Sequence, residues 1–210
     1  MYFKNRKDAA DKLSEALISH KDQKNTLVIG IPKGGVEIGY YLCKNLHLPL
    51  NYILTKKIGH PDMPEYAIGV VSMDDEFLDE KLLKSENIPN SYVEAEVKKV
   101  RDNLKKSLES YPLFTTDYAH KTIILTDDGI ATGKTILLTL KLIKQKKPKK
   151  IIVAIPVGPP FSVEQIKKLA DEVICLYTPA GFIGISQFYS EFNQLDDFQV
   201  ENYLRKANGI

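Results

Sequence analysis

A strand, an acidic pair, a glycine-rich loop and a helix follow one another between residues 121 and 140, and this order constrains the fold more than any other segment. The apolar run Ile123–Leu125 leads to two adjacent carboxylates, Asp127 and Asp128, and then to a loop of small and hydroxyl-bearing residues. Apolar residues recur beyond the loop at the spacing of one helix face, namely Leu137, Leu140 and Ile143. This order is typical of a phosphate-binding site at the carboxyl edge of a parallel sheet.

The loop itself has the residue types that an anion requires. Gly129 and Gly133 let the backbone approach a ligand closely and adopt positive φ. We expect the backbone N–H groups of residues 130–135 to point at one position near the helix start, where the helix dipole favours negative charge. The hydroxyls of Thr132 and Thr135 would join them. The loop is therefore predicted to bind a phosphate group.

The two carboxylates need a different role, because they would repel a phosphate. Hydrogen bonds from sugar hydroxyls, with a divalent cation nearby, would suit Asp127 and Asp128. The alternative is that Asp-Asp-Gly is only a turn between two elements. The complete strand-to-helix pattern favours the ligand-binding interpretation over the turn.

Strand and helix patterns alternate through the rest of the chain. Buried strands are predicted at 27–31, 50–57, 151–155 and 173–177, helices at 6–19, 36–46, 91–110 and 162–169, and a hairpin from 67–73 and 76–79. Capping boxes mark two helix starts, and their residues are Ser91 with Glu94 and Ser162 with Gln165. The stripe predicted to be buried on helix 91–110 is Val93, Val97, Val100, Leu104 and Leu108. The alternation predicts a parallel sheet with right-handed crossovers.

A second glycine turn follows the first predicted strand. Its sequence is Pro32-Lys33-Gly34-Gly35, and a helical pattern begins directly after it. Free backbone N–H groups and the Lys33 ammonium would suit a second anionic group. The alternative is a plain strand-to-helix turn with a proline at the helix start.

A basic strand end and an irregular loop form a third candidate segment. Lys56 and Lys57 precede residues 58–66, which are rich in glycine, histidine and proline, and such loops are often functional lids. The alternative for the two lysines is a solvated charge pair. His60 has a side chain that can act as a general acid or base, and the alternative is an exposed loop histidine.

Aromatic residues gather after the last predicted strand, close to where the carboxyl edge of the sheet must lie. They are Phe182, Phe188, Tyr189 and Phe192. Aromatic rings there could stack on a planar acceptor, whereas core packing is the alternative for most of them.

Residues 123–135 resemble the 5-phosphoribosyl-1-pyrophosphate (PRPP) binding motif of type I phosphoribosyltransferases, an apolar strand followed by two acidic residues and an Ala/Asp-Thr-Gly-x-Thr loop. With the other segments, the chain is similar to a bacterial family of predicted phosphoribosyltransferases with no assigned acceptor. The resemblance implies an α/β, Rossmann-like fold in which helices flank a central parallel sheet. It also implies a single domain over residues 1–210, with a small hood from roughly 1–20 and 178–210.

The resemblance implies a Mg²⁺-dependent transfer of ribose 5-phosphate from PRPP to a nitrogenous acceptor, with release of pyrophosphate. Asp127 and Asp128 would hold the ribose and, indirectly, Mg²⁺ through ribose hydroxyls and water. The residues implied for the 5′-phosphate are Gly129, Ile130, Ala131, Thr132, Gly133, Lys134 and Thr135. Those implied for pyrophosphate are Lys33, Gly34 and Gly35; for catalysis Lys56, Lys57 and His60; and for the acceptor Phe182 and Phe188.

Two departures from the family pattern narrow these expectations. In 6-oxopurine phosphoribosyltransferases an aspartate precedes the Thr-Gly of the motif and acts on the purine, and here that position is Ala131. Hypoxanthine and guanine are therefore less favoured as acceptors. Lys56 stands where several members have arginine, so that planar, bidentate contact is lost while the charge is kept.

Bulk composition limits the remaining function classes. The net charge of +2 does not suggest nucleic-acid binding, and no apolar run reaches the roughly 18 residues of a membrane helix. The arginines are only Arg6, Arg101 and Arg205, so cations within the motifs are lysines. We expect a cytoplasmic protein, and a homodimer is the family expectation. The alternative function is a non-catalytic PRPP- or nucleotide-sensing regulator, although such a protein could dispense with the lysines at 33, 56 and 57.

Overall fold

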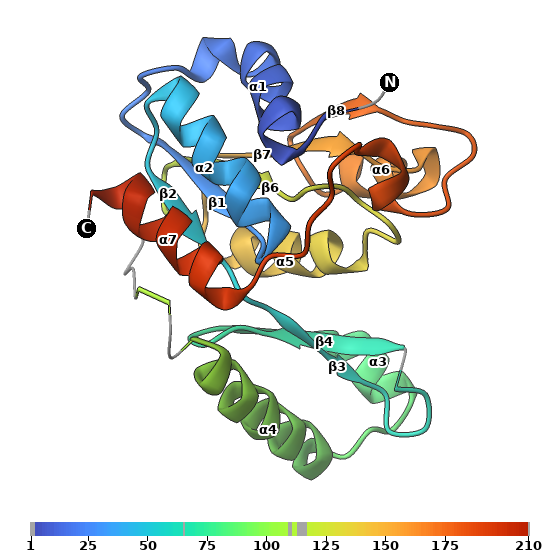
Figure 1. Ribbon diagram of the computed structural model, residues 1–210. Helices are drawn as coiled ribbons and strands as arrows, with labels where there is room; N and C mark the ends of the chain where they lie inside the picture. Colours follow the sequence, from blue (N-terminus) through green and yellow to red (C-terminus); the bar gives the residue numbers. More distant parts are fainter. Residues whose placement is uncertain (1–2, 65, 109–110, 113–116, 210) are drawn as a thin grey trace.

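A five-stranded parallel sheet forms the centre of the computed structural model, which describes residues 3–64, 66–108, 111–112 and 117–209 (Figure 1). Its strand order is β2-β1-β6-β7-β8, and every neighbouring pair is parallel. The strands are β1 (Thr26–Gly30), β2 (Leu50–Tyr52), β6 (Thr122–Thr126), β7 (Lys150–Val157) and β8 (Glu172–Tyr177). The strand order reverses between β1 and β6, and ligands of open α/β sheets bind outside the carboxyl ends of the strands at such a switch point.

Helices cover both faces of this sheet, because alternate strand residues point to opposite sides. Val28, Ile124 and Ile152 belong to a core shared with α1 (Arg6–Ala16), α2 (Gly34–Leu46) and α7 (Asp197–Asn208). Their sequence neighbours belong to a second core shared with α5 (Lys134–Gln145) and α6 (Pro160–Lys167). The predicted α/β architecture, a central parallel sheet flanked by helices, is confirmed.

A smaller antiparallel sheet lies below α5 in the view of Figure 1. It has the order β3-β4-β5, with strands β3 (Lys56–Gly59), β4 (Ala67–Val71) and β5 (Glu76–Leu78). Helices α3 (Glu80–Ser85) and α4 (Asn90–Leu108) pack against it and enclose a third apolar core. The hairpin predicted from 67–73 and 76–79 is confirmed as β4 and β5.

The single strand predicted at 50–57 is wrong, because the structure divides this segment between the two sheets. The Ile53 N–H still donates to the Gly30 carbonyl of β1, at 3.2 Å. Lys56 instead pairs with Val71 of β4. An apolar pattern does not reveal which neighbouring strand pairs with a segment. Here the partner strand changes from β1 at Ile53 to β4 at Lys56.

Both predicted capping boxes are wrong. Helix α4 already includes Asn90 and Ser91, so that Ser91 lies inside its first turn. Helix α6 begins at Pro160, and the Ser162 hydroxyl donates to the Ala131 carbonyl at 3.0 Å instead of capping. The buried stripe on α4 is confirmed for Val93, Val97, Val100 and Leu104. The side chain of Leu108 lies outside the described residues. Glu65, in the predicted loop at 58–66, also lies outside them.

The start of the chain pairs with the segment that follows η2 (Ile185–Phe188). Phe3 forms a parallel bridge with Tyr189, and the two rings are 5.4 Å apart. Two short 3₁₀ helices, η1 (Ile18–His20) and η2, flank these contacts in the sequence. Among the described residues, no helix combines the length and the apolar character needed to cross a membrane.

Candidate functional site

The two predicted glycine turns meet at the switch point between β1 and β6. Gly34 and Gly35, which open α2, pack directly on the acidic pair that follows β6. A β-carbon on Gly34 would overlap the Asp128 carboxylate. One on Gly35 would lie 2.5 Å from the Thr126 carbonyl oxygen and 2.9 Å from the Asp127 Cα. Only glycine allows this close approach, which brings the predicted pyrophosphate turn and the predicted ribose carboxylates together.

The loop after the acidic pair surrounds a small cavity at the start of α5. Gly133 is the N-cap residue and has φ of +74°, a left-handed conformation that favours glycine. The cavity has a volume of about 180 Å³, which suits a small polar group. Its lining residues are Asp127, Gly129, Ile130, Ala131, Thr132, Gly133, Lys134, Thr135, Ile136 and Ile185.

The prediction that all backbone N–H groups of 130–135 point at one anion is wrong for two of them. The Ile130 N–H donates to the Val157 carbonyl at 2.8 Å, which fastens the loop to the end of β7. The Lys134 N–H donates to the Thr132 hydroxyl, at 3.4 Å. Buried backbone donors are nearly always paired, and the carboxyl end of β7 supplies the acceptor for Ile130.

The two carboxylates have different surroundings. Asp127 lines the loop cavity, and its Oδ1 accepts a hydrogen bond from the Asp128 N–H at 2.9 Å. Asp128 does not line this cavity, and its Oδ2 accepts a 2.8 Å hydrogen bond from Nε of Arg6. Adjacent residues with the same side chain therefore have different partners.

Arg6 is a site residue that the sequence interpretation did not identify. Its side chain is only 8% exposed, and its Nη1 lies 3.5 Å from Glu37 Oε2 and 2.8 Å from the Asn193 carbonyl oxygen. The guanidinium also lies over the Phe192 ring, 4.1 Å from its centre. The one available signal was composition, because arginine is rare in this lysine-rich chain and a buried cation that contacts several acceptors favours arginine.

Burial and mutual repulsion disfavour the charged forms of this carboxylate group. Burial raises the pKa of Asp127 well above its usual value, and the Asp128 charge raises it further. Burial also raises the pKa of Asp128, while the Arg6 guanidinium opposes that rise. Burial raises the pKa of Glu37 as well. Three carboxyl groups thus lie near one guanidinium. A bound cation, or hydroxyl groups that donate hydrogen bonds, would favour the ionised form of these carboxyl groups.

Lys33 lies at the mouth of the glycine turn, in contact with the C-terminal helix. Its Nζ is 3.2 Å from Asp197 Oδ1, and both side chains are about half exposed. The same Asp197 oxygen accepts a hydrogen bond from the buried Tyr111 hydroxyl at 2.7 Å. Helix α7 therefore offers Lys33 an acidic partner at the place where an anionic ligand is predicted.

The predicted catalytic residues of the 56–66 segment do not line the loop cavity. Lys56 and Lys57 are exposed on β3. His60 is 6% exposed, so that the exposed-histidine alternative is wrong. Its Nδ1 accepts from the Asp62 N–H at 3.2 Å, while its buried Nε2 has no partner among the described residues. The end of this segment does approach the loop, because Tyr66 and Lys134 line one groove of about 430 Å³.

The predicted acceptor residues, Phe182 and Phe188, do not line the loop cavity. Phe188 is buried in the core, where it stacks on Phe182 with ring centres 5.6 Å apart. Phe182 is half-buried, whereas Ile185 reaches the cavity itself and lies against Gly129. The sequence interpretation did not single out Ile185, because an isolated apolar residue in a loop has no distinguishing pattern.

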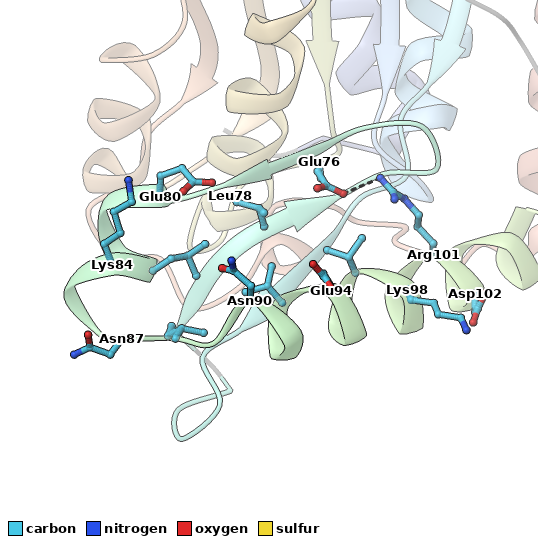
Figure 2. Close-up of a pocket in the computed structure, with 14 residues that line it drawn as sticks. Glu76, Leu78, Glu80, Lys84, Asn87, Asn90, Glu94, Lys98, Arg101 and Asp102 are labelled. Atoms are coloured by element: carbon cyan, nitrogen blue, oxygen red, sulfur yellow. Dashed lines mark hydrogen bonds and ion pairs between the residues drawn. The ribbon is translucent and has the colours of Figure 1, made fainter.

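A groove larger than the loop cavity lies away from this site. It has a volume of about 1010 Å³ and lies between α4 and the β5–α3 segment (Figure 2). Glu76 and Arg101 point toward one another at its wall, and their ion pair is 2.9 Å long. None of the predicted site residues lines this groove, so its size does not indicate the functional site.

Comparisons with known proteins agree with the geometry at the switch point. The chain is 31% identical to TT1426 of Thermus thermophilus, whose crystal structure matches it with a TM-score of 0.87 over 98% of this chain and 99% of that one. A Mycobacterium tuberculosis protein named as a putative phosphoribosyl transferase, present in strains H37Rv and CDC 1551, is 29% identical over 214 residues. That alignment covers 98% of this chain and 47% of the relative, so the chain spans about half the length of these curated relatives.

The sequence profile of a known family extends over most of the chain. The profile described as phosphoribosyl transferase domain matches residues 2–190. The matched range includes both glycine turns, the acidic pair and the loop cavity described above. The chain therefore belongs to the phosphoribosyl transferase domain family.

Proposed function

We propose that this protein transfers ribose 5-phosphate from PRPP to a nitrogenous acceptor and releases pyrophosphate. In this reaction the bond between ribose C1 and the pyrophosphate oxygen breaks, and its electron pair leaves with pyrophosphate. The lone pair of the acceptor nitrogen forms the new bond to C1, and the displaced proton passes to solvent. Negative charge therefore grows on the leaving group, and nearby fixed cations and N–H dipoles lower the barrier.

One observation carries this proposal, namely that Asp127 and the 129–135 loop line the same cavity. A phosphate at the start of α5 and a sugar hydroxyl at Asp127 would belong to one small molecule, and ribose 5-phosphate has both groups. The hydroxyls and the remaining N–H groups of the loop would bind the phosphate, and the carboxylate would accept from the ribose.

The glycine turn at 33–35 supports a second anionic group on the same ligand. Gly34 and Gly35 pack against the acidic pair, and Lys33 carries an exposed ammonium group beside them. Pyrophosphate attached to C1 of a ribose held at Asp127 would extend toward this turn. Lys33 would then stabilise the charge that develops on the leaving group, and Lys56 and Lys57 would do so if the segment at 58–66 closes over the site.

The carboxyl groups of the site fit Mg²⁺ as a helper of this reaction. Hard oxygen ligands suit Mg²⁺, and the three carboxyl groups near Arg6 exceed the available positive charge. Within the described residues no three acidic, histidine or cysteine side chains are close enough to hold a metal ion by themselves. Asp127 and Asp128 would therefore hold the ion indirectly, through ribose hydroxyls and water, and the ion would neutralise the pyrophosphate charge.

The acceptor would bind between the loop and the C-terminal segment. Ala131 supplies no acid for an oxopurine nitrogen, and the apolar Ile185 faces the cavity. In this proposal residues 1–20 and 178–210 act as the hood over the acceptor, with Phe182 at its surface. Bases without a 6-oxo group, or amines, are favoured over hypoxanthine and guanine.

A regulator that binds PRPP without turnover is the second candidate. It is favoured by the position of Lys56 and Lys57, which do not line the loop cavity. A sensor needs the ribose and phosphate contacts but not the groups that stabilise a leaving group.

Pyrophosphate release from PRPP with Mg²⁺, across a panel of bases and amines, separates the two candidates. We expect release with at least one acceptor and weaker release with hypoxanthine and guanine. Calorimetric binding of PRPP with no release for any acceptor would favour the sensor. Absence of PRPP binding would contradict both.

The contact between Lys33 and Asp197 leads to a prediction about donor affinity. Replacing Asp197 by asparagine keeps an acceptor for the Tyr111 hydroxyl but removes the charge that competes for Lys33. Because exposed ion pairs contribute at most about 1 kcal/mol, we expect PRPP affinity to rise by no more than about fivefold. Calorimetry measures the change, and Glu201→Gln, which removes the Arg205 partner on the same helix, is the control. Weaker binding by Asp197→Asn would contradict the competition.

A further inference from the structure

We infer that Arg6 is a positioning residue of this site, which acts on ribose recognition through Asp128 and ties the C-terminal segment to the acidic pair. The inference rests on the proposed function. It assigns a role to a residue of the first helix that belongs to none of the sequence motifs.

The contacts of Arg6 come from three separate parts of the chain. Nε donates to Asp128, at the end of β6, and Nη1 lies within reach of Glu37 on α2. Nη1 also donates to the Asn193 carbonyl, and Phe192 stacks on the guanidinium. One buried side chain therefore joins the acidic pair, the helix of the glycine turn and the C-terminal segment.

These contacts fix the Asp128 carboxylate. Its Oδ2 lies between Arg6 on one side and Gly34 on the other, where no β-carbon fits. The Tyr189 hydroxyl donates to the Asp128 carbonyl at 2.7 Å and holds the backbone of the same residue. Since the Asp128 N–H donates to Asp127, the position of Asp128 also determines where the Asp127 carboxylate lies in the cavity.

The chemistry of these contacts favours arginine. Nε and Nη1 are donors at fixed positions on one planar group. Together they contact the carboxylates of Asp128 and Glu37 and the carbonyl oxygen of Asn193. Lysine at this position would keep the charge but has a single nitrogen. It could not replace all three contacts, so Arg6→Lys tests the geometry apart from the charge.

The experiment compares two ligands that share a phosphate, namely ribose 5-phosphate and inorganic phosphate. Calorimetry gives the affinity of each for the wild type, Arg6→Lys, Asp128→Asn and the double variant. We expect Arg6→Lys to weaken ribose 5-phosphate on the order of tenfold, within the range of coupling between contacting residues. Inorganic phosphate, which needs only the loop, should change less than about twofold, because Arg6 does not line the loop cavity.

Non-additivity identifies Asp128 as the residue through which Arg6 acts. Both changes remove the same contact between Arg6 and Asp128. The double variant should therefore bind ribose 5-phosphate about as tightly as the single variant that has the lower affinity. Arg205→Lys, which alters a surface pair with Glu201, is the control and should leave both affinities unchanged. Thermal unfolding of each variant checks that it is folded at the temperature of the calorimetry.

Each result has a defined meaning. If Arg6→Lys weakens both ligands equally, or neither, or if the losses add in the double variant, the inference is wrong while the proposed function stands. If the wild type does not bind ribose 5-phosphate better than inorganic phosphate, the ribose site and the inference both fail.

Discussion

Asp127→Asn is expected to make the protein more stable and, at the same time, to weaken its binding of PRPP. Burial and the neighbouring Asp128 charge raise the pKa of Asp127 well above its usual value, so the ionised side chain destabilises the folded state. Asparagine has nearly the same shape and still offers an oxygen to the Asp128 N–H. Because it has no charge to bury, we expect a gain of about 1 kcal/mol, or a rise in Tm of about 2–4 °C.

The gain should depend on pH, and its direction follows from the pKa shift. In the unfolded chain Asp127 titrates near 3.8, whereas in the folded protein it keeps its proton to higher pH. The folded state therefore binds more protons between these two values, and the stability of the wild type falls as pH rises through this window. The variant lacks this group, so the stability difference should be small below pH 3.8 and should widen above it.

The loss of binding has a separate cause. A carboxylate accepts charge-assisted hydrogen bonds from ribose hydroxyls, and such bonds contribute about 1.5–3 kcal/mol. The neutral amide should therefore weaken PRPP by roughly 10- to 100-fold. Thermal unfolding between about pH 3 and 8 and calorimetry with PRPP measure the two effects.

Asp74→Asn removes an acidic group of the same kind from an exposed turn and is the control. It should change neither the thermal stability nor the affinity for PRPP. Lower stability of Asp127→Asn with unchanged PRPP affinity would contradict the assignment of Asp127 to the ribose site.

The sequence was sufficient to predict the central sheet and the glycine turns at its carboxyl edge, because both follow from local patterns. Ile123–Leu125 and the loop after Asp128 have the hydrophobic run and the glycines that define a strand and a turn at its carboxyl end. Parallel strands place such ends at one edge, so the meeting of this loop with Gly34 and Gly35 could be expected.

Contacts between distant segments could not be predicted in the same way. Arg6 reaches Asp128 across 122 positions, and no local pattern relates the two. Lys56 belongs to the same predicted strand as Leu50, but the two residues lie in different sheets. The N–H of Ile130 was expected to face a ligand, whereas it pairs with Val157, a partner that only the packing of β6 against β7 supplies.

Gly35→Ala is expected to damage both the fold and the site, because the added methyl group has no space. Its β-carbon would lie 2.5 Å from the Thr126 carbonyl oxygen and 2.9 Å from the Asp127 Cα. Both are backbone atoms at the end of β6, so relief requires the strand end or the start of α2 to move. Overpacking of this kind costs about 1–3 kcal/mol, which corresponds to a fall in Tm of roughly 2–12 °C for a chain of this size.

The same movement would displace Asp127 relative to the loop that completes its cavity. A misplacement on the order of 1 Å can reduce a rate about 100-fold, and we expect the rate of pyrophosphate release to fall by about that factor. Gly181→Ala is the matched control for the effect on stability, because a β-carbon there meets no atom within 4 Å and should not change Tm. Normal turnover in Gly35→Ala would mean that the acidic pair tolerates displacement, and that the contact between the two glycine turns is not required for the reaction.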